Sequence, residues 1–139
     1  MKLYNIVLDG IDKTGKDTIR QYIFYLQNAK YICNTRGYMA MKVYSKLYNR
    51  DYEYDIENQK YILNVLLTAD KEDWEIRCKI TNEPKIDYEQ HSKEFYSVYE
   101  ELTNAGYHTL IFNTSRLTPC EIAKKILEYI NNVNSATDK

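Results

Sequence analysis

An apolar run, a glycine-rich turn and a helix start follow one another at the beginning of the chain, and this succession constrains the fold most. Residues 3–8 read LYNIVL, which is apolar enough for a strand buried on both faces. The next letters, DGIDKTGK, contain Gly10, Gly15 and, directly after the second glycine, Lys16. Helical periodicity then continues to about residue 28. The chain therefore begins with a predicted strand–turn–helix unit.

The rest of the chain repeats this alternation of strand and helix. Strands are predicted at 31–34, 61–67 and 108–112, and helices at 38–49, 70–79, 86–104 and 119–130. Apolar strands that alternate with helices predict an α/β protein with a small, mainly parallel sheet and helices on both faces. We expect one domain over residues 1–132 and a frayed polar tail over 133–139.

Composition excludes several classes of protein. The net charge is −1, which argues against binding to long nucleic acid. The cysteines Cys33, Cys78 and Cys120 are odd in number and far apart, which disfavours a disulfide framework or a zinc site. No apolar run is long enough for a membrane span, and the start of the chain does not resemble a signal peptide. These features predict a cytoplasmic protein with no membrane partner.

The spacing of Gly10, Gly15 and Lys16 matches a phosphate-binding loop. Glycines allow a tight turn whose N–H groups hold phosphate oxygens together with the helix N-terminus, and the lysine reaches the outer phosphates. Thr18 could contact a phosphate or cap the helix, since its hydroxyl suits both roles. We expect the ATP phosphates to bind residues Gly10, Ile11, Asp12, Lys13, Thr14, Gly15, Lys16, Asp17 and Thr18.

The segment LDGIDKTGKDT resembles thymidylate kinase and the related deoxynucleoside monophosphate kinases of the P-loop group. The resemblance implies a three-layer P-loop NTPase fold, ATP and Mg²⁺ as cofactors, and nucleotides as partners. It further implies that Asp9 or Asp12 orients the acceptor nucleotide, with Asp12 at its sugar, and that Lys13 neutralises the transferred phosphoryl group. Members commonly pair through helices, which implies a homodimer.

A second match lies in TRGYMAMKVY, where Arg36 and Tyr44 stand at the family spacing. The resemblance implies that Arg36 clamps the acceptor phosphate and that Tyr44 contacts the acceptor nucleotide. Thr35 and Ala40 replace the family's Asp and Ser. An alternative alignment places NTRG on an earlier Thr-Arg-Glu-Pro segment of the family. One βα unit is absent in the preferred alignment, and this compactness would suit a phage- or virus-type member, acting in the host cytoplasm.

The later segments resemble the family's lid region and its last loop. The lid arginine cluster is thin, and the candidates are Arg77, Lys79 and Lys85. Arg77 is equally compatible with a surface ion pair. The segment NTSRLTP, residues 113–119, lies where the family's last loop surrounds adenine. His91 and His108 have no partner pattern, so we expect both to be structural.

Asp17 and Thr35 suggest how the metal could be held. P-loop enzymes normally support Mg²⁺ with a loop hydroxyl and a carboxylate from a neighbouring strand. Here the loop carries the carboxylate Asp17 and the strand end carries the hydroxyl Thr35, which would preserve both ligand types. The alternative is degeneration, with Asp17 an acidic first-turn residue that the helix dipole favours.

Taken together, the motifs predict transfer of the γ-phosphoryl group of ATP to a deoxynucleoside monophosphate such as dTMP. The expected catalytic residues are Lys13, Lys16, Arg36 and Asp9. The first alternative is a non-catalytic nucleotide-binding or sequestering module. A further alternative is a P-loop kinase that acts on nucleosides or on polynucleotide ends.

Overall fold

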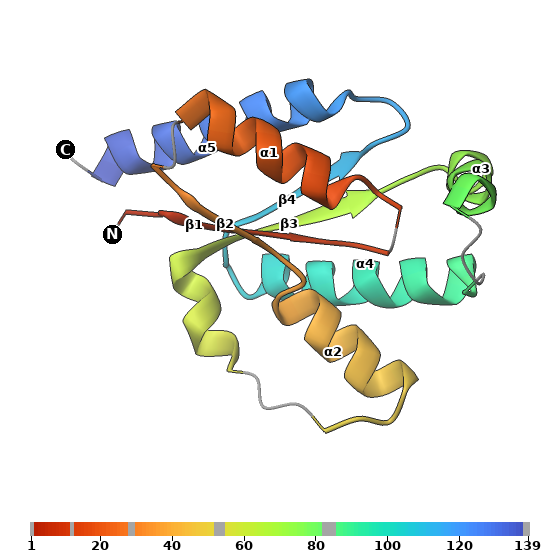
Figure 1. The fold of residues 1–139 in the computed structure, drawn as a ribbon. Coiled ribbons are helices and arrows are strands. Elements are labelled where there is room, and N and C mark those ends of the chain that lie inside the picture. The colour runs from red at the N-terminus through yellow and green to blue at the C-terminus, as the bar shows by residue number, and fades with distance from the viewer. Residues whose placement is uncertain (1, 12, 28–29, 52–54, 82–85, 138–139) are drawn as a thin grey trace.

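The computed structural model describes residues 2–11, 13–27, 30–51, 55–81 and 86–137. Its strands are β1 (Asn5–Asp9), β2 (Ile32–Thr35), β3 (Ile62–Thr68) and β4 (Thr109–Asn113). They form one sheet in the order β2-β1-β3-β4, and every neighbouring pair is parallel. The predicted α/β class with a small parallel sheet is confirmed (Figure 1).

Helices cover both faces of the sheet and make three layers (Figure 1). The helices are α1 (Lys16–Gln27), α2 (Tyr38–Leu47), α3 (Lys71–Thr81), α4 (Tyr88–Asn104) and α5 (Pro119–Thr137). Helices α1 and α5 lie on one face, and α2 and α4 lie on the other. Helix α3 follows β3 directly and sits beyond the carboxyl end of the sheet.

Side chains on the two faces of β3 belong to two separate apolar cores, one on each side of the sheet. Leu63, Val65 and Leu67 belong to the apolar cluster beneath α1 and α5, while Leu66 belongs to the cluster beneath α2 and α4. This division follows from the alternation of side chains along a strand. Burial on both faces is the reason that the strand reads as an almost continuous apolar run.

Asn64 is the polar exception on β3. Its side chain is buried and its Nδ2 donates to Gln59 Oε1 at 3.0 Å. Gln59 lies in a short 3₁₀ helix, η1 (Ile56–Tyr61), within a stretch that the sequence predicts only as a polar connection and a strand start. The Asp55 side chain caps this helix by accepting from the Glu57 N–H at 2.9 Å.

The expected end of the last helix near residue 130 is wrong, because α5 continues to Thr137. The predicted polar tail from residue 133 is part of this helix as far as Thr137. Asn134 explains the extension, since its Oδ1 accepts from the Leu3 N–H at 2.7 Å and its Nδ2 donates to the Leu3 carbonyl at 2.9 Å. The end of α5 is thus fixed to the start of the chain.

The strand order places a crevice at the carboxyl ends of β1 and β3. The chain passes from β1 to β2 on one side, and from β3 to β4 on the other. In open α/β sheets, ligands bind at the position where the strand order reverses in this way. The loop that follows β1 leaves the sheet at this position. No helix in the described ranges is long and apolar enough to cross a membrane.

Candidate functional site

The loop of residues 10, 11 and 13–16, called the lysine loop below, turns sharply between β1 and α1. Gly10 has φ +148° and Gly15 has φ +83°, and the non-glycine Lys13 is left-handed at φ 68°. A Cβ on Gly10 would lie 2.3 Å from the Leu67 carbonyl oxygen, so only glycine fits against β3 there. The spacing of the two glycines therefore reflects real backbone requirements.

The ammonium group of Lys16 lies inside this turn. The residue is only 8% exposed, and its Nζ donates to the carbonyl oxygens of Gly10 at 3.0 Å and Ile11 at 2.9 Å. The Thr14 hydroxyl donates to the same Ile11 carbonyl at 2.8 Å. A buried positive charge thus sits at the N-terminus of α1, where the helix dipole is also positive, and this arrangement attracts an anion.

Asp9 is a buried carboxylate at the end of β1. Its Oδ1 accepts from the Gly37 N–H at 2.9 Å, and its Oδ2 has no hydrogen-bond partner among the described residues. Burial raises the pKa of Asp9 to about 6, against the opposing effects of the Gly37 N–H and the charge of Lys16. The side chain therefore connects β1 to the start of α2.

Arg36 and Gly37 form the turn between β2 and α2. Arg36 is left-handed at φ 63°, and its N–H donates to the Leu8 carbonyl at 3.1 Å. A Cβ on Gly37 would lie 2.5 Å from Val7 Cγ1, so the turn packs directly on β1. This packing fixes the position from which the Arg36 side chain extends.

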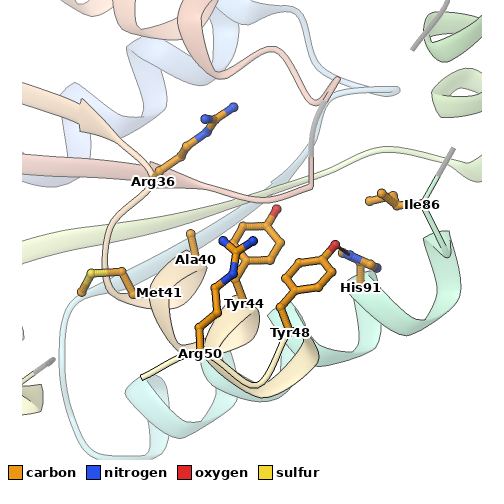
Figure 2. Close-up of a pocket in the computed structure, with 8 residues that line it drawn as sticks. All are labelled: Arg36, Ala40, Met41, Tyr44, Tyr48, Arg50, Ile86 and His91. Atoms are coloured by element: carbon orange, nitrogen blue, oxygen red, sulfur yellow. Dashed lines mark hydrogen bonds between the residues drawn. The ribbon is translucent and has the colours of Figure 1, made fainter. Parts of the chain in front are cut away.

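A cavity of about 400 Å³ opens beside this turn, along α2 and the start of α4 (Figure 2). Arg36 and Tyr44, both predicted to meet the acceptor, line it. The cavity also contains Arg50, Tyr48 and His91, which the sequence does not predict as site residues. The complete lining is Arg36, Ala40, Met41, Tyr44, Tyr48, Arg50, Ile86 and His91.

An ordered aromatic wall forms one side of this cavity. His91 Nδ1 lies 2.9 Å from the Asp87 carbonyl, which can only accept, so this nitrogen carries a proton. In the neutral ring Nε2 is then an acceptor, and the Tyr48 hydroxyl donates to it at 3.1 Å. Tyr44 stacks on Tyr48 at 5.7 Å between ring centroids, and the Arg50 guanidinium lies 5.3 Å from the Tyr48 ring.

The sequence signals for these additional residues differ. Tyr48 follows Tyr44 by four residues, a spacing that places both on one face of α2 and could have suggested the pair. Arg50 lies just after the helix and His91 on a distant helix, so no local pattern connects them to the site. His91 is buried and fully bonded, as a structural histidine would be, yet it also lines the cavity.

A second cavity of about 390 Å³ opens against the lysine loop. Its walls come from the lysine loop, the start of α1, helix α3 and the residues that lead into α5. The lining is largely apolar and consists of Lys13, Thr14, Gly15, Thr18, Ile19, Arg77, Ile80, Thr81, Thr114 and Pro119. The site therefore offers one cavity on the α2 and α4 side and another on the α1 and α5 side.

The structure describes two of the three lid candidates, Arg77 and Lys79. Arg77 lies on α3, where its Nη1 donates to the Lys13 carbonyl at 2.8 Å and to the Thr114 hydroxyl at 3.1 Å. Lys79 is on the same helix and is exposed to solvent. Lys85 lies outside the described residues, as does the predicted acceptor contact Asp12.

Asp17 and Thr35 both lie near the carboxyl edge of the sheet. Asp17 is exposed in the first turn of α1, and Thr35 is the half-buried last residue of β2, paired with Leu8 of β1. The described part of the chain contains no cluster of three or more His, Cys, Asp or Glu side chains that could hold a metal ion. A carboxylate and a hydroxyl are nevertheless donors of the oxygen type that Mg²⁺ prefers.

Comparisons with known proteins returned no relatives. No family model matches the chain, and no curated protein matches it either. The case for a function therefore rests on the geometry of this chain. That geometry consists of a buried lysine in the loop between β1 and α1, one cavity against this loop, and a second cavity along α2 that two arginines line.

Proposed function

We propose that the chain is an ATP- and Mg²⁺-dependent kinase that phosphorylates a deoxynucleoside monophosphate. One observation carries the proposal: the buried Lys16 ammonium lies in the loop between β1 and α1, whose Lys13 is left-handed, and the second cavity opens against this loop. The strand–loop–helix context is the one in which this glycine and lysine spacing binds phosphates. The P-loop NTPase fold implied by the resemblance is part of the same proposal.

In this proposal the donor nucleotide occupies the second cavity. The lysine loop would hold the ATP phosphates through its N–H groups and Lys16, while the apolar surface of Ile80 and Pro119 would contact the base. Asp17 and Thr35 would provide oxygens for Mg²⁺, whose charge offsets that of the outer phosphates. Displacement of the Gly10 and Ile11 carbonyls from Lys16 would release the ammonium for phosphate binding.

The acceptor would occupy the first cavity. Arg36 and Arg50 provide two guanidinium groups for its phosphate, which planar arginine forks bind well. Tyr44 and Tyr48 provide an aromatic surface against which a base can stack. The dTMP-like acceptor implied by the resemblance is compatible with a cavity of about 400 Å³.

Phosphoryl transfer requires mainly positioning and neutralisation of charge. Lys16 and Lys13 would neutralise the migrating group, and Arg36 would fix the acceptor phosphate. Asp9 would contribute through the protein, because its carboxylate holds the Gly37 N–H next to Arg36. We thus propose a positioning role for Asp9 in place of the direct contact with the acceptor that the resemblance implies.

A non-catalytic nucleotide-binding module is the second candidate function. Asp17 occupies the loop position where a hydroxyl is usual, and the Arg77 guanidinium is already bonded to Lys13 and Thr114. Both features favour a site that binds nucleotide with little machinery for transfer. This module would use the same lysine loop and the same second cavity.

An assay of ADP release separates the two functions. Purified protein is mixed with ATP, Mg²⁺ and each deoxynucleoside monophosphate in turn, and nucleotide binding is measured in parallel by calorimetry. We expect turnover with at least one acceptor, and loss of it in Lys16→Ala but not in Lys125→Ala, an exposed lysine on α5. Binding without turnover would favour the module, and absence of nucleotide binding would contradict both functions.

A further inference from the structure

The side chain of Arg77 joins three segments that are far apart in the sequence. Its Nη1 donates to the Lys13 carbonyl at 2.8 Å and to the Thr114 hydroxyl at 3.1 Å, and its Nη2 lies 3.4 Å from the Thr114 carbonyl. The Thr114 hydroxyl in turn donates to the Thr68 carbonyl at 2.9 Å, at the end of β3. Arg77 thus connects the lysine loop to the carboxyl ends of β3 and β4.

Helix α3, which carries Arg77, is itself fixed to the loop between β4 and α5. The Asp70 N–H donates to the Ser115 hydroxyl at 2.8 Å, and Asn113 Nδ2 donates to Asp70 Oδ1 at 2.9 Å. Trp74 is buried in the core beneath the helix. These contacts fix the helix that carries Arg77 to the rest of the fold. The resemblance instead places Arg77 in the family's lid region.

The hydrogen bond from Arg77 to the Lys13 carbonyl reaches the lysine loop at its left-handed non-glycine residue. Lys13 is left-handed without being glycine, an unfavourable conformation that persists only where the surroundings hold it. A charged donor on a carbonyl makes one of the stronger hydrogen bonds in proteins. The guanidinium of Arg77 therefore stabilises the left-handed backbone conformation of Lys13 in the lysine loop.

We propose that Arg77 is a positioning residue, which braces the lysine loop through the Lys13 carbonyl and so fixes the direction of the Lys13 side chain. It acts from α3 and Thr114 before any nucleotide arrives. Its effect on the loop is independent of the proposed function, whereas its effect on turnover rests on that function. A lid arginine that binds only nucleotide phosphates would behave differently in both respects.

Hydrogen exchange of the protein without nucleotide tests the brace directly. We expect Arg77→Met and Thr114→Val each to increase amide exchange in residues 10–16, the first by about tenfold or more, as loss of a charge-assisted hydrogen bond implies. Arg77→Lys keeps the charge without the fork and should give a smaller increase. Arg116→Met, an exposed arginine in the same β4–α5 loop, is the matched control and should leave this exchange unchanged.

The proposal is overturned if the lysine loop exchanges at the wild-type rate in Arg77→Met. If that variant does not fold, the same result in both Arg77→Lys and Thr114→Val overturns it. Weaker ATP binding with unchanged exchange would identify Arg77 as a direct nucleotide ligand, which also contradicts the brace. None of these measurements depends on turnover, so failure of the kinase assay leaves this test intact.

A double-mutant cycle tests the link to Lys13 where turnover is found. If Arg77 acts by directing the Lys13 side chain, Arg77→Met should cause a smaller loss of kcat in a Lys13→Ala background than in the wild type. We expect the two fold-losses to differ by at least a factor of three. Equal losses in both backgrounds would show that Arg77 acts independently of Lys13 and would overturn this part of the proposal.

Discussion

At the scale of single residues, Asp9 is a predicted site residue that the structure shows buried and bonded to a backbone N–H. Its position before Gly10 suggested direct contact with a ligand, but in the structure its carboxylate is buried and accepts from the Gly37 N–H. No sequence pattern reveals this partner, because Gly37 lies on another strand–helix turn. The same carboxylate has a raised pKa, which makes its role measurable.

Stability should depend on pH through Asp9. Its pKa is raised from 3.8 to about 6 in the fold, so the folded state binds a proton more tightly than the unfolded chain does. The resulting stabilisation is complete below pH 3.8 and is lost as pH rises through 6, a change of about 3 kcal/mol. Asp9→Asn has no carboxyl group that titrates at this position. Urea unfolding should therefore show that the stability of this variant, relative to wild type, increases from pH 4 to pH 7. A difference that is constant over this range would contradict the assignment.

Gly37 should tolerate no side chain in the wild-type background. An added Cβ would lie 2.5 Å from Val7 Cγ1, so Gly37→Ala must displace β1 or the start of α2, at a cost of about 1–3 kcal/mol. Val7→Ala removes the clashing methyl groups, and the double variant should therefore lose less stability than the two single losses added together. Additive losses in urea unfolding would show that the two side chains do not meet.

At the scale of elements, the sequence predicts the strands and helices well, apart from the end of α5 and the short 3₁₀ helix η1. Each of the four predicted strands overlaps the observed one, because apolar runs between polar turns depend on local composition. The end of α5 was missed because Asn134 is held by Leu3, which is 131 positions away in the sequence. Arg77 was assigned to a lid for a similar reason, since its partner Thr114 is 37 positions away.

The paired hydrogen bonds of Asn134 should stabilise the C-terminal part of α5. Asn134→Ala removes both bonds to the Leu3 backbone, and we expect a loss of about 1–3 kcal/mol in the free energy of unfolding. Asn132→Ala, an exposed position on the same helix, provides the matched control and should change little. Similar values for the two variants in urea unfolding would argue against the contact with Leu3.

At the scale of the whole molecule, the two cavities lie over different helices of the fold. The connections from β1 and β3 diverge, so the lysine loop emerges between the helix pairs on opposite faces. The alternation of strands and helices predicts a parallel sheet with a ligand edge, and this part of the architecture could be read from the sequence. The aromatic wall of the first cavity could not, because Tyr48 and His91 meet only through the packing of α2 on α4.

Under the proposed function, this separation predicts that the affinities for ATP and for dTMP can be changed independently. Arg50 lines only the first cavity and Ile80 only the second. Arg50→Met should weaken binding of dTMP by about tenfold, as loss of a charged hydrogen bond implies, and should leave ATP binding within about twofold of wild type. Ile80→Ala should weaken ATP binding by about fivefold through lost apolar contact, without affecting dTMP.

Calorimetry with each nucleotide alone measures all four affinities without requiring turnover. If Arg50→Met weakens only dTMP binding and Ile80→Ala weakens only ATP binding, the two ligands occupy separate cavities. A general loss of structure would weaken the binding of both ligands in both variants. An exchanged pattern, with Arg50→Met weakening ATP and Ile80→Ala weakening dTMP, would reverse the assignment of donor and acceptor. Equal effects of either variant on both nucleotides would instead place both ligands in one shared site, although Arg50 and Ile80 line different cavities.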